Sequence, residues 1–402
     1  MPQFRLFVFL LLSLALWTVS CTQTTTNEPT SEKTTDASTA DKAVADTNAA
    51  DKGGEPATEP VPEKKPDVNA PTEPYTEVVF DKTRINSKGK INVRHALKEF
   101  ELKGTSFKRV TLQVELHTTC FPFSKWRDDP PPAGHRWPPK CDAYDRLFTF
   151  ILDPKTDKNP KPGIELVRAV TPFGGPMKFD IDVTDIFNGL PGKHTLRVNI
   201  GTWSDGKGQV SGSDGGWNVT AKLKVVPGVA PRNVLAVIPL FDYSYKHNDG
   251  KIDEAKFTIP KGTRKIRLEY RTTGHGGGKA DRPACIGHAD EFCRRTHLLY
   301  VDGKEMQALV PWRDDCAKRC NEGPVPGPSG RNINVCRSNP TGSIASVKAP
   351  RANWCPGAIT QPFWFDYKEL TTPGEHTFGF KVRNVAKGGS WRTTAVVIAY
   401  GE

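Results

Sequence analysis

The sequence predicts an all-β protein whose folded part consists of two bodies of the sandwich or barrel type. From residue 76 onward, apolar residues alternate with polar ones over many short stretches, as a strand with one buried face requires. Clusters of Gly, Pro, Asn and Asp separate these stretches, and no long segment places apolar residues at a helical spacing. Many short strands in this rhythm are typical of β-sandwiches and barrels.

The clearest strands are expected on both sides of one interruption. They cover residues 110–116, 147–152, 179–183, 195–200, 265–270, 297–301, 378–382 and 394–398. The stretch 226–232, which contains two prolines and a glycine, breaks the pattern near the middle. We therefore expect an N-terminal body at 76–226 and a C-terminal body at 227–402, each of a suitable size for one sandwich.

The first 21 residues have the layout of a secretory signal. Arg5 precedes an apolar run over residues 6–17, and the small residue Ser20 precedes Cys21. A cysteine at this point resembles the lipobox of bacterial lipoproteins, in which the thiol is lipidated. We therefore expect Cys21 to anchor an exported lipoprotein to a membrane, at the outer membrane or cell surface.

Two alternatives to the lipid anchor stay open. Thr18 stands where the lipobox usually has leucine, so ordinary signal-peptidase cleavage would give a secreted or periplasmic protein. A membrane-spanning anchor is disfavoured because the apolar run is about 12 residues, short of the roughly 20 that a spanning helix needs.

Residues 22–75 are predicted to be a disordered tether. They contain eleven acidic and five basic residues, with much Thr, Ala and Pro and almost no large apolar side chain. Such a segment cannot bury enough surface to offset its chain entropy. It carries a net charge of −6, within a chain whose formal charge is +11.

The remainder of the chain is therefore strongly basic. Such a charge suits acidic glycans, phosphate or anionic surfaces, or simply keeps the protein soluble. No run of Lys and Arg interleaved with aromatic residues is present, so nucleic acid is not an expected partner. A mean hydropathy of −0.50 excludes a protein with many membrane spans.

Eight of the nine cysteines are expected to form disulfides. They are Cys120, Cys141, Cys285, Cys293, Cys316, Cys320, Cys336 and Cys355. An even number in an exported chain implies disulfides, and short separations favour 120 with 141 and 285 with 293. The last four would pair among themselves, although their spacing also loosely fits a zinc site, which an oxidising compartment disfavours.

The segment 141–146, Cys-Asp-Ala-Tyr-Asp-Arg, is the first of three candidate functional segments. It leads directly into the strand expected at 147–152. Asp142 and Asp145 would point to opposite faces of an extended chain, so at most one would face a given pocket. Arg146 would favour the ionised form of Asp145 if their side chains met. A solvated strand edge is the alternative interpretation.

The second segment is 290–297, Asp-Glu-Phe-Cys-Arg-Arg-Thr-His. Glu291 lies two residues before Cys293, so a disulfide there would hold its backbone rigid, as a catalytic or binding carboxylate requires. Three nearby histidines, His275, His288 and His297, raise the possibility of a metal site. Their spacing matches no recognised ligand pattern, so we expect no metal.

The third segment is 349–357, in which Arg351 and Trp354 precede Cys355. An arginine beside a tryptophan can bind the face and the hydroxyls of a sugar. The pair can equally cover the edge of a core. The residues themselves leave these two interpretations open.

Taken together, these segments resemble the peptide:N-glycosidase F family of bacterial glycoamidases. The resemblance rests on the segments 141–146, 181–185, 291–297 and 351–357, which follow the family's order and lie in both halves of the chain. It covers roughly residues 80–400. It implies two antiparallel eight-stranded jelly rolls packed side by side. The related copper-dependent peptide-hydroxylating monooxygenases need His and Met ligands that this chain does not offer, so no cofactor is expected.

The resemblance also implies an activity and its residues. The family hydrolyses the amide between asparagine and the innermost N-acetylglucosamine of N-glycans, so N-linked glycoproteins or glycopeptides are the expected partners of a monomeric enzyme. Asp145 and Glu291 match the family's two central carboxylates. The expected substrate-binding residues are Arg146, Arg351, Trp203, Trp354, Tyr144 and His275.

Two departures from the family pattern keep other functions open. Gly201 stands where the family has a third carboxylate, two residues before the tryptophan that matches Trp203. Tyr144 and His275 stand where the family usually has tryptophan. The alternatives are a weak or inactive glycan-binding lipoprotein on the same fold, and a structural or adhesion lipoprotein whose tryptophans belong to the core.

Overall fold

The computed structural model describes residues 71–88, 91–207, 209–210, 212, 214–246, 250–277, 284–327 and 329–402. The expected signal segment, Cys21 and almost all of the expected tether lie outside these ranges. No helix within the described ranges is long and apolar enough to cross a membrane.

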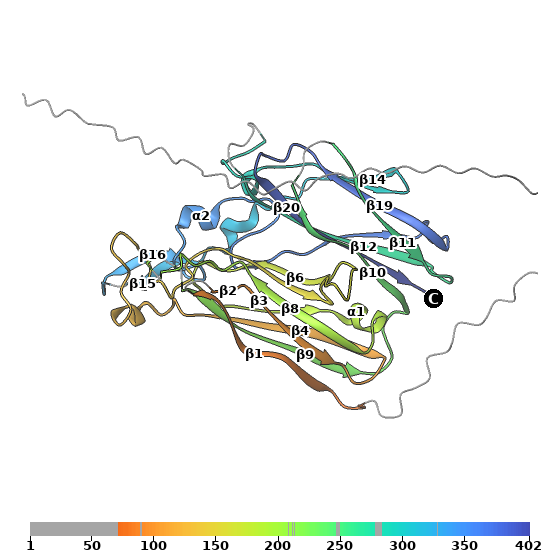
Figure 1. Cartoon of the computed structure of the whole chain (residues 1–402), viewed down its shortest axis with the longest axis horizontal. Coiled ribbons are helices and arrows are strands. Elements are labelled where there is room, and N and C mark those ends of the chain that lie inside the picture. The colour runs from red at the N-terminus through yellow and green to blue at the C-terminus, as the bar shows by residue number, and fades with distance from the viewer. Residues whose placement is uncertain are drawn as a thin grey trace, which may run out of the picture. The chain divides into compact units, whose positions relative to one another are not determined.

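The N-terminal jelly roll consists of two five-stranded antiparallel sheets (Figure 1). One sheet has the order β2 (Ile91–Val93), β1 (Tyr75–Lys88), β9 (Gly216–Pro227), β4 (Phe107–Thr118) and β7 (Met177–Asp182). The other has the order β17 (Ala358–Ile359), β6 (Ile164–Val170), β5 (Leu147–Leu152), β8 (Lys193–Ile200) and β3 (His95–Glu101). A short helix, α1 (Thr184–Gly189), follows β7.

The C-terminal jelly roll has two four-stranded sheets. Their orders are β10 (Val234–Tyr245), β20 (Gly389–Tyr400), β12 (Lys265–Gly276) and β18 (Phe363–Tyr367), and β11 (Asp253–Ile259), β19 (Gly374–Val382), β13 (His297–Val301) and β14 (Lys304–Leu309). The predicted all-β double jelly roll is thus confirmed. The C-terminal roll has the expected eight strands in its two sheets. The N-terminal roll has nine strands from its own half of the sequence and a tenth, β17, from the C-terminal half.

The eight stretches predicted as strands all lie in observed strands, and one of them runs a residue too far. Residue Val183 was expected to end a strand, but it caps α1 instead. Alternation made these strands visible because one face is buried; in β4, for example, Val110, Leu112, Val114 and Leu116 are fully buried.

In each roll the first and the last long strand pair within one sheet. In the N-terminal roll β1 pairs with β9, from Tyr75 opposite Val225 to Asn86 opposite Gly216. In the C-terminal roll β10 pairs with β20, from Val234 opposite Tyr400 to Tyr245 opposite Trp391.

The two rolls share a contact surface, which we call the seam. Strand β17 comes from the C-terminal half of the sequence and completes a sheet of the N-terminal roll. The main N-terminal core also takes in Val396, Ile398 and Tyr400 of β20. A side-chain hydrogen bond from Tyr400 to Asp185 of α1 adds to this contact.

At the centre of the seam lies a buried ion pair between Glu165 and Arg168 of β6. Both side chains are fully buried, and Arg168 Nε donates to Glu165 Oε1 over 2.9 Å. From the C-terminal roll, Thr394 Oγ1 donates to Glu165 Oε2 over 2.6 Å, and the carbonyl of Arg392 accepts from Arg168 Nη1 over 2.6 Å. Arg271 of β12 also lies against this pair, 3.9 Å from Glu165 Oε2.

One end of the molecule carries a small third core built from both halves of the sequence. The 3₁₀ helix η1 (Phe123–Arg127) packs against the hairpin of β15 (Glu322–Pro326) and β16 (Asn332–Cys336), as the left side of Figure 1 shows. Beside this core, Thr341 Oγ1 donates to the carbonyl of Ala143 over 2.8 Å. The chain just before Asp145 is thereby tied to the C-terminal half.

The eight cysteines predicted to form disulfides do so. The pairs are Cys120–Cys141, Cys285–Cys293, Cys316–Cys355 and Cys320–Cys336. The two local pairs and the pairing of the last four among themselves are confirmed. The alternative of a zinc site is wrong, because sulfurs joined in disulfides offer no thiolate to a metal.

Candidate active site

Asp145 occupies the chain just before β5, at one end of its sheet. The neighbouring backbone is fixed by Thr171, whose N–H donates to the carbonyl of Arg146 and whose hydroxyl accepts from the N–H of Arg146, each over 2.8 Å. Gly201, directly after β8, donates its N–H to the carbonyl of Leu147 over 3.2 Å. Asp145 and the segment that leads to Trp203 therefore lie at the same end of the sheet.

Glu291 lies on the 3₁₀ turn η2 (Asp290–Phe292), which its neighbours hold in place. The fully buried Asp290 accepts hydrogen bonds from Arg295 Nε over 2.9 Å and from the N–H of Ala386 over 3.1 Å. The disulfide at Cys293 closes the turn, as the sequence predicted. This anchoring role of Asp290 was not predictable, since an acid beside another acid looks like a solvated loop.

Arg351 carries a buried guanidinium whose side chain is only 1% exposed. Its Nη2 donates to the carbonyl and the hydroxyl of Ser346, over 2.9 and 3.1 Å. Its Cζ lies 4.8 Å from the ring centre of Phe292 and 4.5 Å from that of Trp354. Ser346, on α2 (Ile344–Lys348), was not predicted, because nothing in its neighbourhood distinguishes it from other surface serines.

The structure brings Asp145, Glu291 and Arg351 together. Arg351 Nη2 lies 3.8 Å from Asp145 Oδ2, and Nη1 lies 4.0 Å from Glu291 Oε1. Both separations exceed those of direct hydrogen bonds. The Nε and Nη1 groups of Arg351 are buried and have no hydrogen-bond partner among the described residues. Since buried donors are almost always paired, these groups are available to a bound molecule.

Burial dominates the electrostatics of the two carboxylates. Burial raises the pKa of Asp145 to about 6; Arg351 opposes this increase and Glu291 adds to it. Burial also raises the pKa of Glu291, again against the effect of Arg351. Their side chains are nevertheless 25% and 27% exposed, so a substrate can reach them. A carboxylate with a pKa near 6 is suited to exchanging protons near neutral pH.

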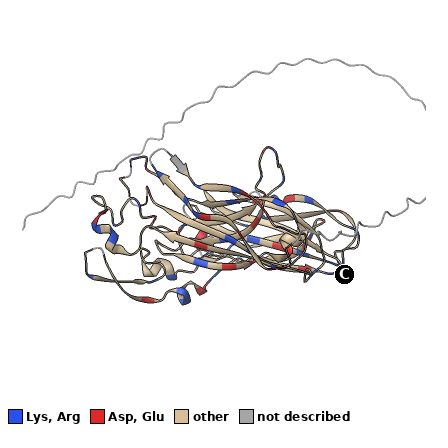
Figure 2. Ribbon diagram, turned by 90° about the horizontal axis from the view of Figure 1, so that it is seen from below, with Lys and Arg blue, Asp and Glu red and all other residues tan. Residues whose placement is uncertain are grey.

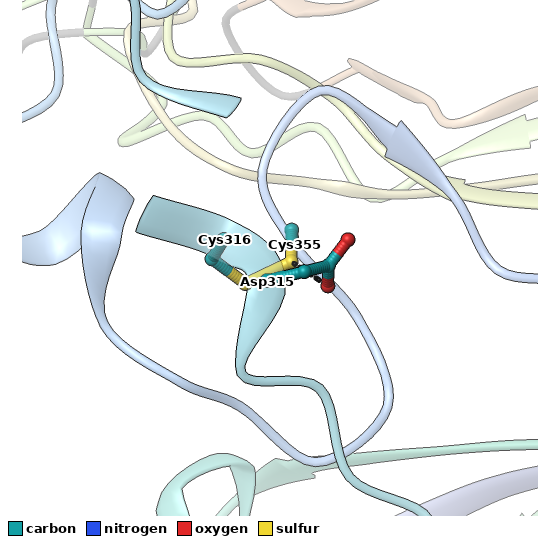
Figure 3. Close-up of side chains that lie close together, drawn as sticks. All are labelled: Asp315, Cys316 and Cys355. Carbon is teal, nitrogen blue, oxygen red and sulfur yellow. Dashed lines mark hydrogen bonds between the residues drawn. A yellow bond between two sulfur atoms is a disulfide. The ribbon is translucent and has the colours of Figure 1, made fainter. Parts of the chain in front are cut away.

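A disulfide cysteine lies within four residues of each of these three charged residues. Cys141 precedes Asp145, Cys293 follows Glu291, and Cys355 follows Arg351. Figure 3 shows the last of these bridges, with Asp315 beside it. Asp315 is held by Arg313, whose Nε and Nη2 donate to its two oxygens over 2.8 and 2.6 Å. This cluster is thus an ion pair against a disulfide.

The structure decides two questions that the sequence left open. Arg146 does not meet the carboxylate of Asp145, because its Nε donates to the buried Asp142 over 2.9 Å. Trp354 is not an exposed surface for a sugar: it is 2% exposed, and its Nε1 donates to the carbonyl of Gly274 over 3.0 Å. Its indole supports Arg351 from behind. Of the two interpretations, the structure thus favours the one in which Trp354 covers the edge of the core, which the segment's own sequence could not show.

The remaining expected binding residues have different surroundings. Tyr144 and Trp203 are exposed, by 37% and 40%. Tyr144 stacks on Arg146, whose Cζ lies 4.8 Å from its ring centre. His275 stacks on Trp354, with ring centres 5.6 Å apart, and its Nε2 lies 2.7 Å from Thr273 Oγ1. Burial and nearby arginines lower the pKa of His275 to about 3, which leaves it neutral.

The three histidines considered for a metal site have separate environments. His297 is fully buried and its Nδ1 lies 2.7 Å from the hydroxyl of Tyr270, whereas His288 is exposed. They do not come together as a group of metal ligands in the part of the chain that the structure describes.

Basic and acidic positions are interspersed along the strands, as Figure 2 shows.

Comparison with known proteins agrees with the resemblance inferred from the sequence. Residues 242–400 match the family model described as "Peptide-N-glycosidase F, C terminal". Comparison with curated protein sequences gives no match. The resemblance to the peptide:N-glycosidase F family is thereby confirmed for the C-terminal roll by sequence, and for the fold of both rolls by solved structures.

Three solved structures illustrate the shared fold. PNGF-II has 21% sequence identity and a TM-score of 0.58, and the match covers 81% of this chain and 66% of that one. A peptide-N(4)-(N-acetyl-β-D-glucosaminyl) asparagine amidase has 19% identity and a TM-score of 0.59, with 82% and 96% covered. PNGase F, a glycosylasparaginase from Flavobacterium meningosepticum, has 20% identity and a TM-score of 0.56, with the same coverage. This chain thus spans just under two thirds of PNGF-II.

Proposed function

We propose that this chain, which resembles the peptide:N-glycosidase F family, is a glycoamidase that hydrolyses the amide between asparagine and N-acetylglucosamine in N-glycoproteins. Water adds to the side-chain carbonyl carbon of asparagine, the C–N bond breaks, and aspartate and a glycosylamine are the products. The observation that carries the proposal is the meeting of Asp145 from one roll with Glu291 and Arg351 from the other.

In this proposal each of the three groups has a separate role. Asp145 takes a proton from the attacking water, for which its pKa of about 6 is suited. The unpartnered Nε and Nη1 of Arg351 donate to the carbonyl oxygen of the scissile amide as it gains negative charge. Glu291 orients the substrate nitrogen and its sugar. Asp145 then gives the proton that it took from water to this nitrogen, the C–N bond breaks, and the glycosylamine leaves.

The rigidity of the site supports this assignment. Catalysis of this type depends on donors that already point to where charge develops. Two aromatic rings and Ser346 hold the guanidinium of Arg351, and disulfides hold the three segments that meet there. The surrounding groups therefore need little reorganisation during the reaction.

The test is mass spectrometry of a denatured N-glycoprotein after incubation with the full chain, beside the variant Asp145→Asn. We expect free glycan and conversion of the glycosylated asparagine to aspartate, with a rate at least about 100-fold lower in the variant. No release from several glycan classes by a chain shown to be folded would overturn the proposal.

A second candidate function is glycan binding without hydrolysis. It is favoured by Gly201, which leaves open space where the family has a carboxylate: an added Cβ would meet no atom within 4 Å. Binding of glycans by the folded wild-type chain, without release of product, would establish it.

We also propose that the chain is exported and anchored through Cys21. Four disulfides support the export, because such bonds persist in oxidising compartments outside the cytosol. The anchor rests on the position of Cys21 after the apolar run.

A further inference from the structure

A polar cavity lies at the seam, apart from Asp145, Glu291 and Arg351. Its volume is about 200 Å³, and residues of both rolls line it. The N-terminal roll contributes Glu165 of β6 together with Asp182 and Asp185 near α1. The C-terminal roll contributes residues of β12 and β18 and the segment between β17 and β18. None of its lining residues belongs to the candidate active site.

Arg271, which lines this cavity, has an unused hydrogen-bond donor. The residue is 7% exposed and lines the cavity. Its Nη1 donates to the carbonyl of Glu165 over 2.6 Å, but its Nε is buried and has no partner among the described residues. A buried donor without a partner is unusual in a folded protein, and a polar ligand in the cavity would satisfy it.

Trp364 supplies a flat apolar face beside this donor. It lies on β18, is 54% exposed and lines the same cavity. Its Nε1 donates to Glu269 Oε1 over 3.1 Å, which fixes the orientation of the ring. An exposed tryptophan held in one orientation next to polar groups combines a stacking surface with directional contacts.

The charges around the cavity favour a neutral ligand. Arg232 is paired with Asp185 over 2.7 Å, and Arg267 is paired with Asp366 over 2.7 Å. Carboxylates and guanidinium groups both line the cavity, so neither a free anion nor a free cation is favoured. The volume of this cavity is below the roughly 300–1,000 Å³ of pockets for drug-sized molecules, so it suits a ligand of about the size of one monosaccharide.

We propose that this cavity is a second sugar-binding site, which holds one neutral monosaccharide unit against Trp364. The apolar face of the pyranose ring packs on the indole. Its hydroxyl groups accept from Arg271 Nε and donate to the carboxylate of Glu269, while Gln361 lies at the same wall. The site is separate from hydrolysis, so its occupation does not depend on the function proposed above.

Nuclear magnetic resonance of the full chain tests this site directly. The indole N–H resonance of Trp364 is assigned by its absence in Trp364→Phe, and neutral hexoses, N-acetylhexosamines and fucose are then titrated one by one. We expect at least one of them to shift this resonance saturably, with a Kd of roughly millimolar size. In the variants binding is followed by the resonances of the sugar instead, and in Trp364→Ala and Glu269→Gln it should weaken at least about tenfold.

The controls separate this site from the candidate active site. Leu97→Ala removes a comparably exposed apolar side chain from β3 and should leave binding unchanged. Shifts confined to the resonance of Trp203 would place the sugar at the candidate active site and overturn the proposal. Absence of any shift at Trp364 with every sugar up to about 50 mM would overturn it as well.

Discussion

Two regions of this molecule combine arginine with carboxylates across the two rolls, and they do so in opposite ways. At the seam, Glu165 and Arg168 are in direct contact and further hydrogen bonds surround them. At the candidate active site, Arg351 stands 3.8 and 4.0 Å from its two carboxylates and keeps two donors unused. Glu165 and Arg168 are paired with each other inside the fold, whereas Arg351 keeps donors that a substrate can use.

The pKa directions express the same difference. Burial alone would raise the pKa of Glu165, but Arg168 and Arg271 outweigh it and hold this pKa at about 2. Burial raises the pKa of Asp145 to about 6, and the more distant Arg351 does not outweigh it. Proximity of the arginine therefore decides which carboxylate stays charged and which can exchange a proton.

The largest expected effect is on stability, from Glu165→Gln at the seam. This variant leaves Arg168 and Arg271 buried without their counter-charge, which should lower the free energy of unfolding by about 3–5 kcal/mol. Chemical unfolding of the full chain measures it. The matched control is Glu99→Gln, which breaks an exposed pair with Lys193 and should leave the free energy of unfolding nearly unchanged. Equal effects in the two variants would contradict the assigned role of the seam.

A smaller effect is expected from Arg351→Lys at the candidate active site. Lysine keeps the charge but cannot present several donors from a plane held between two rings. The kcat of glycan release should fall about 10- to 100-fold with KM less affected. The control is Arg319→Lys, which alters an exposed arginine bound to Asp315. An unchanged kcat in Arg351→Lys would exclude the role assigned to its guanidinium.

The pH dependence of stability should have opposite signs in the two regions. Asp145 has a raised pKa, so its ionised form disfavours the folded state above about pH 6, and this penalty disappears as the pH falls toward 4. Asp145→Asn should therefore melt a few degrees above the wild type at pH 8 and level with it at pH 4. Glu165 has a lowered pKa, so its stabilising effect is present above about pH 4.5 and is lost as the pH falls toward 2.

Thermal melting of the wild type and both variants at pH 3, 4, 6 and 8 measures these trends. A Glu165→Gln deficit that grew on acidification would contradict the assignment at the seam. A constant difference between Asp145→Asn and the wild type would show that Asp145 has an ordinary pKa.

The smallest effect is expected from Gly201→Glu, which adds a carboxylate near the candidate active site. The site offers space for a side chain, and the backbone there is not in the left-handed region, so the melting temperature should change little. Glycan release should become a few times faster than in Gly201→Gln, which has the same size without the charge. Equal rates in these two variants would show that a third carboxylate has no role here.

Much of the fold could be predicted because it depends on local alternation and on cysteine pairing. The order of Asp145, Glu291 and Arg351 along the chain was also visible through the resemblance. The orientation of Trp354 and the partner of Arg146 were not, since both depend on neighbours distant in sequence or on which side is buried.

The seam could not be predicted from the sequence for a related reason. All seven residues of β6 are buried, including Glu165 and Arg168, so this strand shows no alternation. Its charged residues are compensated by Thr394 and the carbonyl of Arg392, more than 220 positions later in the chain. No local pattern can reveal such a partnership.

The pairing of first with last strands has a consequence for how the chain folds. Strand β1 pairs with β9, and β10 pairs with β20. Neither pair can form before the roughly 150 residues between its two strands have been synthesised. Loop closure of this length is slow, and unpaired strand edges are exposed meanwhile. Because β1 and β9 both precede β10, the N-terminal roll can close its own strands during synthesis. Asp145 then meets Glu291 and Arg351 only after the C-terminal roll has folded, so newly made molecules should complete the candidate active site last.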